Sequence, residues 1–322
     1  MTEDCVRPLI GIARTSPADD RVIWRGRKVL VTGATGFIGN HLCQALASRG
    51  AAVHAVARSA APGSSLAGGV THAGDLADVH IARAVFEASR PEVVYHLAGA
   101  VATAVDPELV QPTLRSNLLT TVSLLEAARE TGCGRVVVAA SADEPRPGEP
   151  PRTPYAASRV ASSLYTRMYC EAFGVPAVLA RIFLAYGPGQ NRSRLVPYVL
   201  RCAFRGELPA LRCPERRCDL VFVNDVVSAL LALADCPVAA GAAVDVGSGE
   251  AVAVRDVAAL AFRVVSGHGE TGPSSGACSD DSGGDGVADT GRTAALTGWQ
   301  PRWSLREGLE ATFSWLRSVE ET

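Results

Sequence analysis

The chain has 322 residues, a formal net charge of −2 and a hydrophobic content of 48 %. This length suffices for one large α/β domain with a smaller lobe. The near-neutral charge argues against the basic surface of a nucleic-acid-binding protein. No apolar run reaches the roughly 18 residues that a membrane-spanning helix needs. We therefore expect neither a nucleic acid nor a membrane as partner.

Residues 1–24 carry several charged side chains and lack the apolar run of a signal peptide. We interpret residues 1–26 as an N-terminal extension. The nine cysteines are scattered, and none shows the usual zinc-binding spacing. This pattern predicts reduced thiols in a cytoplasmic protein without a metal site.

Short β-branched segments alternate with longer helical segments up to residue 186. Strands are expected at 29–31, 53–57, 93–97, 136–140 and 177–181, and helices at 38–48, 82–89, 116–131 and 155–173. This alternation predicts an α/β protein with a Rossmann-type, doubly wound parallel sheet covered on both faces. Ligands of such sheets bind outside the carboxyl ends of the strands. We assign the dinucleotide-binding domain to residues 27–186.

After residue 186 the rhythm of the pattern changes. Helices at 195–205, 225–234 and 304–317 and a strand at 220–223 predict a smaller substrate lobe over residues 187–322. Residues 219–250 of this part are expected to return partly to the Rossmann core. Residues 266–286 are rich in Gly, Ser and Asp, which predicts a mobile loop.

Gly33, Gly36 and Gly39 form a GxxGxxG turn after the first strand. The first glycine permits a tight turn, the second clears space for a pyrophosphate, and the third lets the helix pack against the strand. The helix N-terminus then offers N–H groups and a partial positive charge to the phosphates. The sequence therefore predicts a dinucleotide site, which includes the other residues of this turn, Thr35, Phe37 and Ile38.

The second strand ends with Ala57-Arg58-Ser59. An acidic residue at this end would accept a hydrogen bond from the ribose 2′-OH of NAD. Arg58 and Ser59 instead favour the 2′-phosphate of NADP, although NAD and a solvated surface arginine remain alternatives. Asp75, followed by Leu76, is a candidate acceptor for the adenine amino group or a turn-capping residue.

Further motifs follow in order along the chain: His96-Leu-Ala-Gly99, Asn117, Ser141, Pro154-Tyr155-Ala-Ala-Ser-Arg159, Arg181-Ile-Phe-Leu-Ala-Tyr-Gly-Pro-Gly-Gln190, Val223-Asn-Asp-Val226, Val246-Gly-Ser-Gly-Glu250 and Gly298-Trp-Gln-Pro301. With the glycine-rich turn, they make residues 28–318 resemble the extended short-chain dehydrogenase/reductase family, specifically its nucleotide-sugar epimerases and dehydratases. The resemblance implies an NADP or NAD cofactor, a nucleotide-diphosphate sugar as substrate, and a homodimer formed by helices 116–131 and 155–173.

Chemistry of this kind needs a base, because a hydride leaves a sugar carbon only as the attached hydroxyl loses its proton. A tyrosinate is suitable, and a nearby cation and a serine hydroxyl favour it over a free tyrosine, whose pKa is about 10. By similarity, Tyr155 is the base, Ser141 polarises the substrate oxygen, and Arg159 stands where the family lysine binds the nicotinamide ribose. The resemblance places four further residues beside the cofactor: Leu97, Ala98, Gly99 and Asn117.

Two departures from the family pattern affect this expectation. Arg159 keeps the positive charge, but its planar fork is not equivalent to a lysine ammonium, so either an adapted or a catalytically silent site is possible. Asp143 and Glu144 lie one place later than the Thr-Asp-Glu run of the sugar 4,6-dehydratases. They are candidate acids or bases, or solvated loop charges.

The substrate contacts are predicted from arginines. Arg192 and Arg194 stand in the segment that covers the nucleotide in the family, and Asn117 is a further candidate contact. Cys218 replaces a family arginine that would bind the pyrophosphate, and Arg217 or Arg216 can take its place. Arg292 is either another phosphate contact or a solvated residue at a helix start.

The leading expectation from the sequence is an NAD(P)-dependent epimerase that acts through a transient keto intermediate. A nucleotide-sugar 4,6-dehydratase and an NADPH-dependent ketoreductase are alternatives. A catalytically silent cofactor-binding protein is the alternative of another class, because Arg159 replaces the expected lysine.

Overall fold

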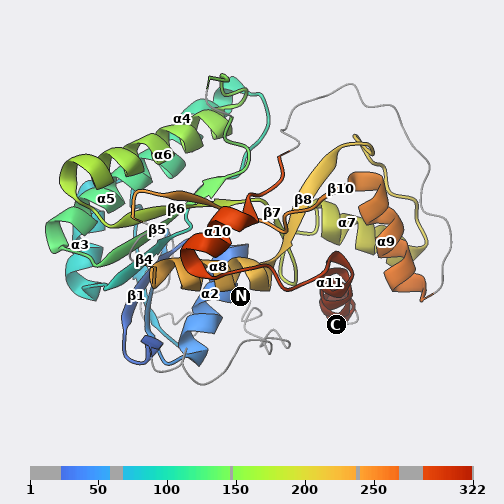
Figure 1. Cartoon of the computed structure of the whole chain (residues 1–322), viewed down its shortest axis with the longest axis horizontal. Coiled ribbons are helices and arrows are strands. Elements are labelled where there is room, and N and C mark those ends of the chain that lie inside the picture. The colour runs from blue at the N-terminus through green and yellow to red at the C-terminus, as the bar shows by residue number, and fades with distance from the viewer. Residues whose placement is uncertain (1–22, 59–67, 146–147, 237–239, 268–285, 321–322) are drawn as a thin grey trace.

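The computed structural model describes residues 23–58, 68–145, 148–236, 240–267 and 286–320. Ser59, most of the extension at 1–26 and most of the expected loop at 266–286 lie outside the described residues. In the described part, the chain forms a large parallel sheet with helices on both faces and a smaller lobe beside it (Figure 1).

Seven parallel strands form the large sheet in the order β3-β2-β1-β4-β5-β6-β9. The order reverses direction at β1, so β1 and β4 flank the point where a doubly wound sheet binds ligands. The central strands are almost completely buried, as expected for a sheet covered on both faces. The strands are β1 Lys28–Thr32, β2 Ala52–Ala57, β3 Val70–Ala73, β4 Val93–His96, β5 Arg135–Ser141, β6 Ala177–Ile182 and β9 Ala243–Val246.

One hydrophobic cluster lies on each face of the sheet. Helices α2 (Phe37–Ser48) and α8 (Val223–Ala234) cover one face, where Leu42 and Leu230 are fully buried. Helices α3 (Val79–Ser89), α5 (Thr120–Thr131) and α6 (Pro154–Phe173) cover the other face (Figure 1). The predicted fold class is therefore confirmed.

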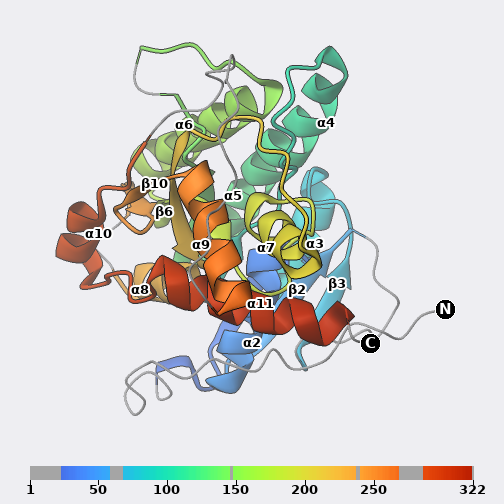
Figure 2. The same ribbon diagram turned by 90° about the vertical axis from the view of Figure 1, so that its right-hand side faces the viewer.

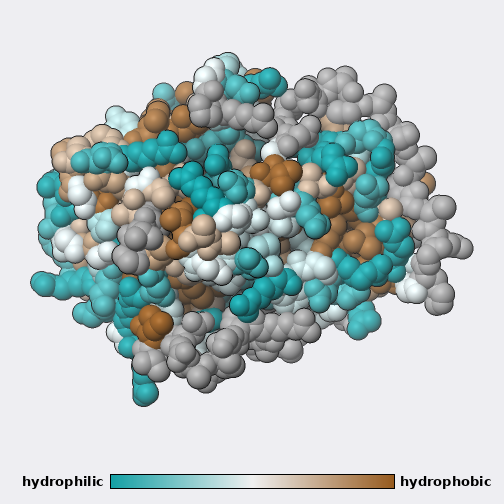
Figure 3. All heavy atoms as spheres, viewed as in Figure 1, coloured by the Kyte–Doolittle hydropathy of each residue, from teal (hydrophilic) through white to brown (hydrophobic). Residues whose placement is uncertain are grey.

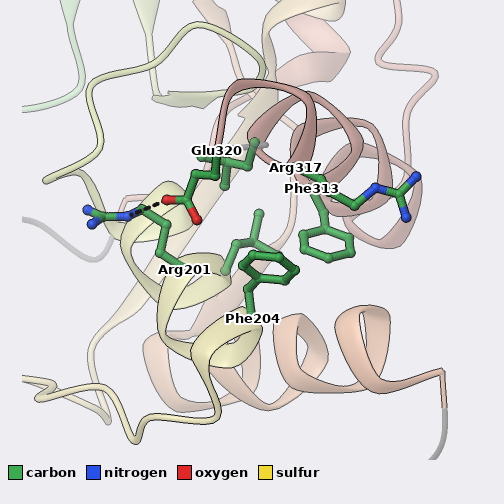
Figure 4. Close-up of a pocket in the computed structure, with 7 residues that line it drawn as sticks. Arg201, Phe204, Phe313, Arg317 and Glu320 are labelled. Carbon is green, nitrogen blue, oxygen red and sulfur yellow. Dashed lines mark hydrogen bonds and ion pairs between the residues drawn. The ribbon is translucent and has the colours of Figure 1, made fainter. Parts of the chain in front are cut away.

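The smaller lobe has its own hydrophobic cluster between a short mixed sheet and three helices (Figure 2). The sheet contains β7 Leu184–Tyr186, β8 Arg217–Phe222 and β10 Ala251–Ala253, and the helices are α7 Leu195–Arg205, α9 Val254–Ser266 and α11 Leu305–Glu320. Figure 4 shows the seam between α7 and α11, where the rings of Phe204 and Phe313 pack 5.7 Å apart beside an Arg201–Glu320 ion pair of 3.1 Å. Side chains fill this seam, which explains how α11 closes the lobe.

Two buried aspartates hold later segments of the chain against the fold. Asp219 on β8 accepts hydrogen bonds from the backbone N–H groups of Ser248 (2.6 Å) and Ala288 (3.0 Å). Asp225 on α8 accepts from those of Arg302 and Trp303. Helix α10 (Thr290–Thr297), which follows Ala288, packs against β9. The segment beyond residue 286 thereby contacts both sheets.

The structure corrects several expected elements. Strand β8 runs from Arg217 to Phe222 and Val223 already belongs to α8, so the strand expected at 220–223 was placed too late. The helix expected at 116–131 is interrupted: η2 (Leu114–Leu119) is a π-helix that leads into α5. Strands β3, β7, β9 and β10 and helix α9 were not predicted.

Among the described residues, six cysteines carry free thiols: Cys43, Cys133, Cys170, Cys202, Cys218 and Cys236. Within the same ranges, no helix is both long enough and apolar enough to cross a membrane.

Candidate dinucleotide and catalytic site

The turn between β1 and α2 has the close contacts that its glycines permit. Gly33 has φ +69°, and a Cβ there would lie 2.8 Å from the backbone of Leu97 and Ala98. A Cβ on Gly39 would lie 2.1 Å from the Gly33 carbonyl oxygen. Helix α2 therefore packs directly on the end of β1, and only glycine fits at these two positions.

The same turn leaves the N-terminus of α2 open toward a ligand. Gly36 is the N-cap, no side chain caps it, and the first turn of the helix carries no acidic residue. Thr35 and Gly36 are exposed, while Phe37 and Ile38 are half-buried beneath them. These residues fit a bound pyrophosphate, because the first-turn N–H groups and the helix dipole point at an anion without a competing side chain.

The adenosine end of the predicted site lies at the ends of β2 and β3. Arg58, which follows β2, is exposed, and Asp75 follows β3. Asp75 accepts a hydrogen bond from the Ala77 N–H and forms an ion pair with Arg115, and both contacts lower its pKa. Asp75 is thus a turn residue as well as a member of a charged cluster, while the adjacent Leu76 is buried in the core.

The loop after β4 is fixed by side chains from two elements. The Ala98 N–H donates to the Thr32 hydroxyl (3.1 Å), and Ala100 exchanges two hydrogen bonds with the amide of Asn117. The Ala100 N–H lies 2.8 Å from Asn117 Oδ1. The backbone of the loop Leu97–Gly99 is therefore fixed beside the glycine-rich turn, where the predicted cofactor contacts lie.

A buried chain of hydrogen bonds connects this loop to helix α5. His96 Nδ1 lies 2.8 Å from the Thr32 hydroxyl, and His96 Nε2 lies 3.0 Å from the Thr121 hydroxyl. Thr121 donates its proton to the Asn117 carbonyl (2.6 Å), so it accepts from His96 Nε2–H. His96 Nδ1 then accepts from Thr32. The contacts thus define a neutral, Nε2-protonated His96.

The chain of hydrogen bonds continues into helix α6 through Asn117. Asn117 Nδ2 donates to the Ser158 hydroxyl (2.8 Å), which in turn donates to the Tyr155 carbonyl (2.8 Å). Asn117 lies in the π-helix η2, where the widened turn directs its buried side chain at both the loop and α6. Single π-turns of this kind often occur at functional sites.

Tyr155 and Arg159 pack together beside β5, the strand that ends at Ser141. Tyr155 and Arg159 are 4 % and 6 % exposed, and the Arg159 guanidinium carbon lies 5.5 Å from the centre of the Tyr155 ring. Arg159 Nη1 donates to the Ala139 carbonyl (3.2 Å) on β5, two residues before Ser141. A Cβ on Gly99 would lie 2.3 Å from Arg159 Nη2, so Gly99 leaves the space that the arginine fork fills.

The two acidic residues after Ser141 lie in different environments. Asp143 is exposed, and its N–H donates to the Ser141 hydroxyl (3.1 Å). Glu144 turns inward and accepts from the Ser141 N–H (3.1 Å) and the Ser163 hydroxyl of α6 (3.0 Å). Burial raises the pKa of Glu144. Glu144 therefore bridges the strand that carries Ser141 and the helix that carries Tyr155.

The predicted substrate arginines are spread over several elements. Arg192 and Arg194 are exposed just before α7, and Arg194 is the N-cap of that helix. Arg292 is exposed in the first turn of α10, which packs on β9. Within the described residues, the structure gives no contact between these three arginines and Ser141, Tyr155 or Arg159.

Arg216 and Arg217 are the candidates to take the place of the family arginine that Cys218 replaces, and they make different contacts. Arg217 and Cys218 are successive residues of β8 and so point to opposite faces. Cys218 packs against the cluster of the small lobe, and Arg217 donates to the Ala251 carbonyl on β10. Arg216 is exposed, and its carbonyl continues the ladder to Val254. Arg216 directly precedes the first residue of β8, so it lies outside the strand.

Sequence reasoning missed several residues of this site: His96 as a hydrogen-bonding link, Thr121, Ser158, Ser163 and Arg115. His96 and Ser158 stand inside motifs of the sequence, but nothing in the sequence shows their hydrogen bonds. Thr121, Ser163 and Arg115 lie in helices outside every motif, so only the packing of the elements brings them to the site. The four-residue spacing of Asn117 and Thr121 was the one signal that could have indicated a shared helix face.

Comparisons with known proteins agree with this geometry. The model of the NAD dependent epimerase/dehydratase family matches residues 29–247. A dTDP-4-dehydro-6-deoxy-D-allose reductase of Streptomyces is 29 % identical, with 91 % of this chain and 97 % of that protein covered. A UDP-glucose 4-epimerase of Mycolicibacterium smegmatis is 28 % identical, covering 91 % of this chain and 100 % of the relative.

Solved structures of the same kind superpose on this fold. MoeE5 in complex with UDP-glucuronic acid and NAD is 29 % identical, with a TM-score of 0.76 over 91 % of this chain and 99 % of that one. The UDP-glucose 4-epimerase of Thermotoga maritima has a TM-score of 0.81 at 22 % identity over 91 % and 99 % of the two chains. The chain belongs to the NAD-dependent epimerase/dehydratase family, a family of enzymes within the extended short-chain dehydrogenases/reductases.

We predict that His96 stays neutral far below the usual pH range, because burial and then the charge of Arg159 lower its pKa to about 3. An unfolded chain binds this proton near pH 6.5, so the contribution of His96 to stability should be lost as the pH falls from about 6.5 toward 3. ¹⁵N NMR of the ring should show the Nε2–H tautomer without titration between pH 8 and 4.5.

The variant His96→Gln isolates this effect from that of the other histidines. The difference in the free energy of unfolding between the wild type and this variant should shrink as the pH falls below 6.5. A ring signal of His96 that titrates near pH 6.5 in the folded protein would contradict the assigned hydrogen bonds.

Proposed function

We propose that this chain is an NAD(P)-dependent epimerase that acts on a nucleotide-diphosphate sugar through a transient keto intermediate. The observation that carries the proposal is the position of Arg159, which packs on Tyr155, binds the strand that ends at Ser141 and fills the space beside Gly99. A bound nicotinamide would supply the hydride acceptor and donor for the sugar carbon, and the residues of this chain would hold the sugar and move its proton.

The residues of the chain account for the proton side of this reaction. Tyr155 takes the proton of the sugar hydroxyl, and the Ser141 hydroxyl donates a hydrogen bond to the same oxygen as it becomes a carbonyl. The Arg159 guanidinium carbon lies 5.5 Å from the centre of the Tyr155 ring, and the remaining donors of its fork would bind the nicotinamide ribose. Burial of Tyr155 and Arg159 keeps this exchange away from bulk water.

The nucleotide end of the substrate would bind on the small lobe. Arg192 and Arg194 precede α7, and the exposed Arg216 stands directly before β8, two residues from Cys218. We propose these guanidinium groups for the pyrophosphate, since arginine binds phosphate in a bidentate manner. Relatives that act on or bind UDP- and dTDP-sugars support this substrate class.

Two observations rank the alternatives. Oε1 of Glu144 accepts from both the Ser141 N–H and the Ser163 hydroxyl, so this carboxyl group serves as a link between β5 and α6, which ranks the 4,6-dehydratase below the epimerase. Arg58 favours NADP and thereby a net ketoreductase, which is the second candidate function. A reductase among the relatives supports it.

The test is an assay of the purified chain with UDP-glucose, UDP-glucuronic acid or dTDP-glucose, with NAD⁺ or NADP⁺ added. We expect a product of unchanged mass with no net change of cofactor, and a loss of at least about 100-fold in Tyr155→Phe because the base is removed. Tyr165→Phe, an exposed tyrosine on the same helix, is the matched control and should retain full turnover.

Other outcomes of this assay contradict the epimerase. A product lighter by one water would indicate a dehydratase, and stoichiometric NADPH consumption with a keto sugar would indicate the reductase. An inactive wild type in which Arg159→Lys restores turnover would indicate the silent cofactor-binding protein. We expect Arg159→Lys to lower turnover, because lysine cannot bind Ala139 and fill the space at Gly99 together.

We also propose that the chain forms a homodimer through η2, α5 and α6. Exposed apolar side chains on these neighbouring helices include Leu119, Leu164, Tyr165 and Met168. In Figure 3, brown and tan residues lie over this side of the molecule. Exposed apolar area of this kind marks an interface, and two copies of the helix pair would cover it.

The oligomeric state tests this surface directly. Leu164, at 58 % exposure on α6, becomes charged in Leu164→Arg, which should convert a dimer into a monomer in light scattering coupled to size exclusion. Leu208→Arg is the control, because Leu208 is 75 % exposed outside these helices. A monomeric wild type, or a Leu164→Arg variant that remains dimeric, would contradict the proposed interface.

A further inference from the structure

Arg115 is a charged residue at the adenosine end of the site that belongs to none of the sequence motifs. It projects from η2, two residues before Asn117. Its Nε and Nη2 atoms lie 2.9 Å and 2.7 Å from Asp75 Oδ2. Asp75 Oδ1 is held separately by the Ala77 N–H at 3.0 Å. The guanidinium is thus fixed in place by a carboxylate that is itself anchored to the backbone.

This ion pair lies next to Arg58. Ala57 and Ala73 are paired at the ends of β2 and β3, and the Gly74 N–H donates to the Ala57 carbonyl (3.1 Å). Arg58 and Asp75 therefore leave neighbouring strands at the same edge, beside the turn that follows β1. The charge of Arg58 also contributes to the low pKa of Asp75, which agrees with this proximity.

The charges of the three side chains decide which dinucleotide suits this edge. An aspartate alone would repel a 2′-phosphate and favour a ribose 2′-OH. Arg115 offsets that charge, and with Arg58 the cluster carries one net positive charge. Arg115 is 59 % and Asp75 41 % exposed at the side chain, so a ligand can reach both. The N–H groups of Arg115 Nη1 remain available for such a ligand among the described residues.

We propose that Arg115 is a cofactor-selecting residue, which binds the 2′-phosphate of NADP together with Arg58 and is held in position by Asp75. This inference rests on the dinucleotide site of the proposed function. The role of Asp75 then changes from a candidate acceptor for the adenine amino group to a support for an arginine that favours NADP. A planar guanidinium with two free N–H donors suits a phosphate in this position.

The experiment measures binding of NADP⁺ and NAD⁺ to the full chain by calorimetry, without a sugar, so that it does not depend on turnover. The wild type should bind NADP⁺ more tightly. In Arg115→Gln the affinity for NADP⁺ should fall by at least about tenfold, as expected for the loss of a charge-assisted contact, while that for NAD⁺ changes less than about threefold.

Two further variants separate selection from a structural effect. Arg83→Gln removes an arginine that binds Glu130 through the same two nitrogen atoms, Nε and Nη2, on α3 and α5, and should leave both affinities unchanged. Arg115→Lys keeps the charge and should recover part of the NADP⁺ affinity.

Three results would overturn the proposal. A wild type that prefers NAD⁺ would exclude NADP selection while leaving the epimerase intact. Equal losses for both cofactors in Arg115→Gln would assign Arg115 a merely structural role. A wild type that binds neither dinucleotide would remove the site on which the inference rests.

Discussion

The arrangement of the site depends on one buried chain of hydrogen bonds, which runs from Thr32 through His96 and Thr121 to Asn117 and Ser158. The Thr121 hydroxyl donates to the Asn117 carbonyl, so the direction of the bonds from Thr121 to His96 and from His96 to Thr32 follows from it. A buried polar group left without its partner costs about 1–3 kcal/mol, so a satisfied chain favours one arrangement of β1, β4, η2 and α6. The loop beside the glycine-rich turn and the helix that carries Tyr155 are thereby held in one fixed relation.

The loop proposed to contact the cofactor and the proposed catalytic residues lie next to each other at Gly99 and Arg159. Gly99 has no side chain, and the Arg159 fork fills the space and bonds to β5. Glu144 ties the end of β5 to α6 from the other side, through the Ser141 N–H and the Ser163 hydroxyl. The replacement of lysine by arginine is therefore matched by its surroundings, which supports an adapted rather than a degraded site. The small lobe, closed by α11, carries the guanidinium groups that we propose for the substrate pyrophosphate.

The sequence predicted the parts of the fold that follow from local patterns. The glycine spacing, the buried strands β1, β4, β5 and β6 and the long helices α2, α6 and α7 follow from hydrophobic period and turn chemistry, and the structure confirms them. The short strands β7 and β10 have three residues each, too few to show a period. The π-turn at η2 and the contacts of His96, Glu144 and Arg115 were not predictable, because each depends on a partner far along the chain. The sequence likewise did not show that Arg217 and Cys218 point to opposite faces, because this follows from where strand β8 begins.

We infer that the chain of hydrogen bonds from Thr32 to Ser158 shapes a preformed site for a nicotinamide dinucleotide. The most direct measurement is mass spectrometry of the small molecules that acid releases from the freshly purified protein. We expect NADP or NAD in an amount close to one molecule per chain, because an epimerase recycles its cofactor in place. A protein that releases no dinucleotide and also fails to bind added NADP⁺ or NAD⁺ would contradict it.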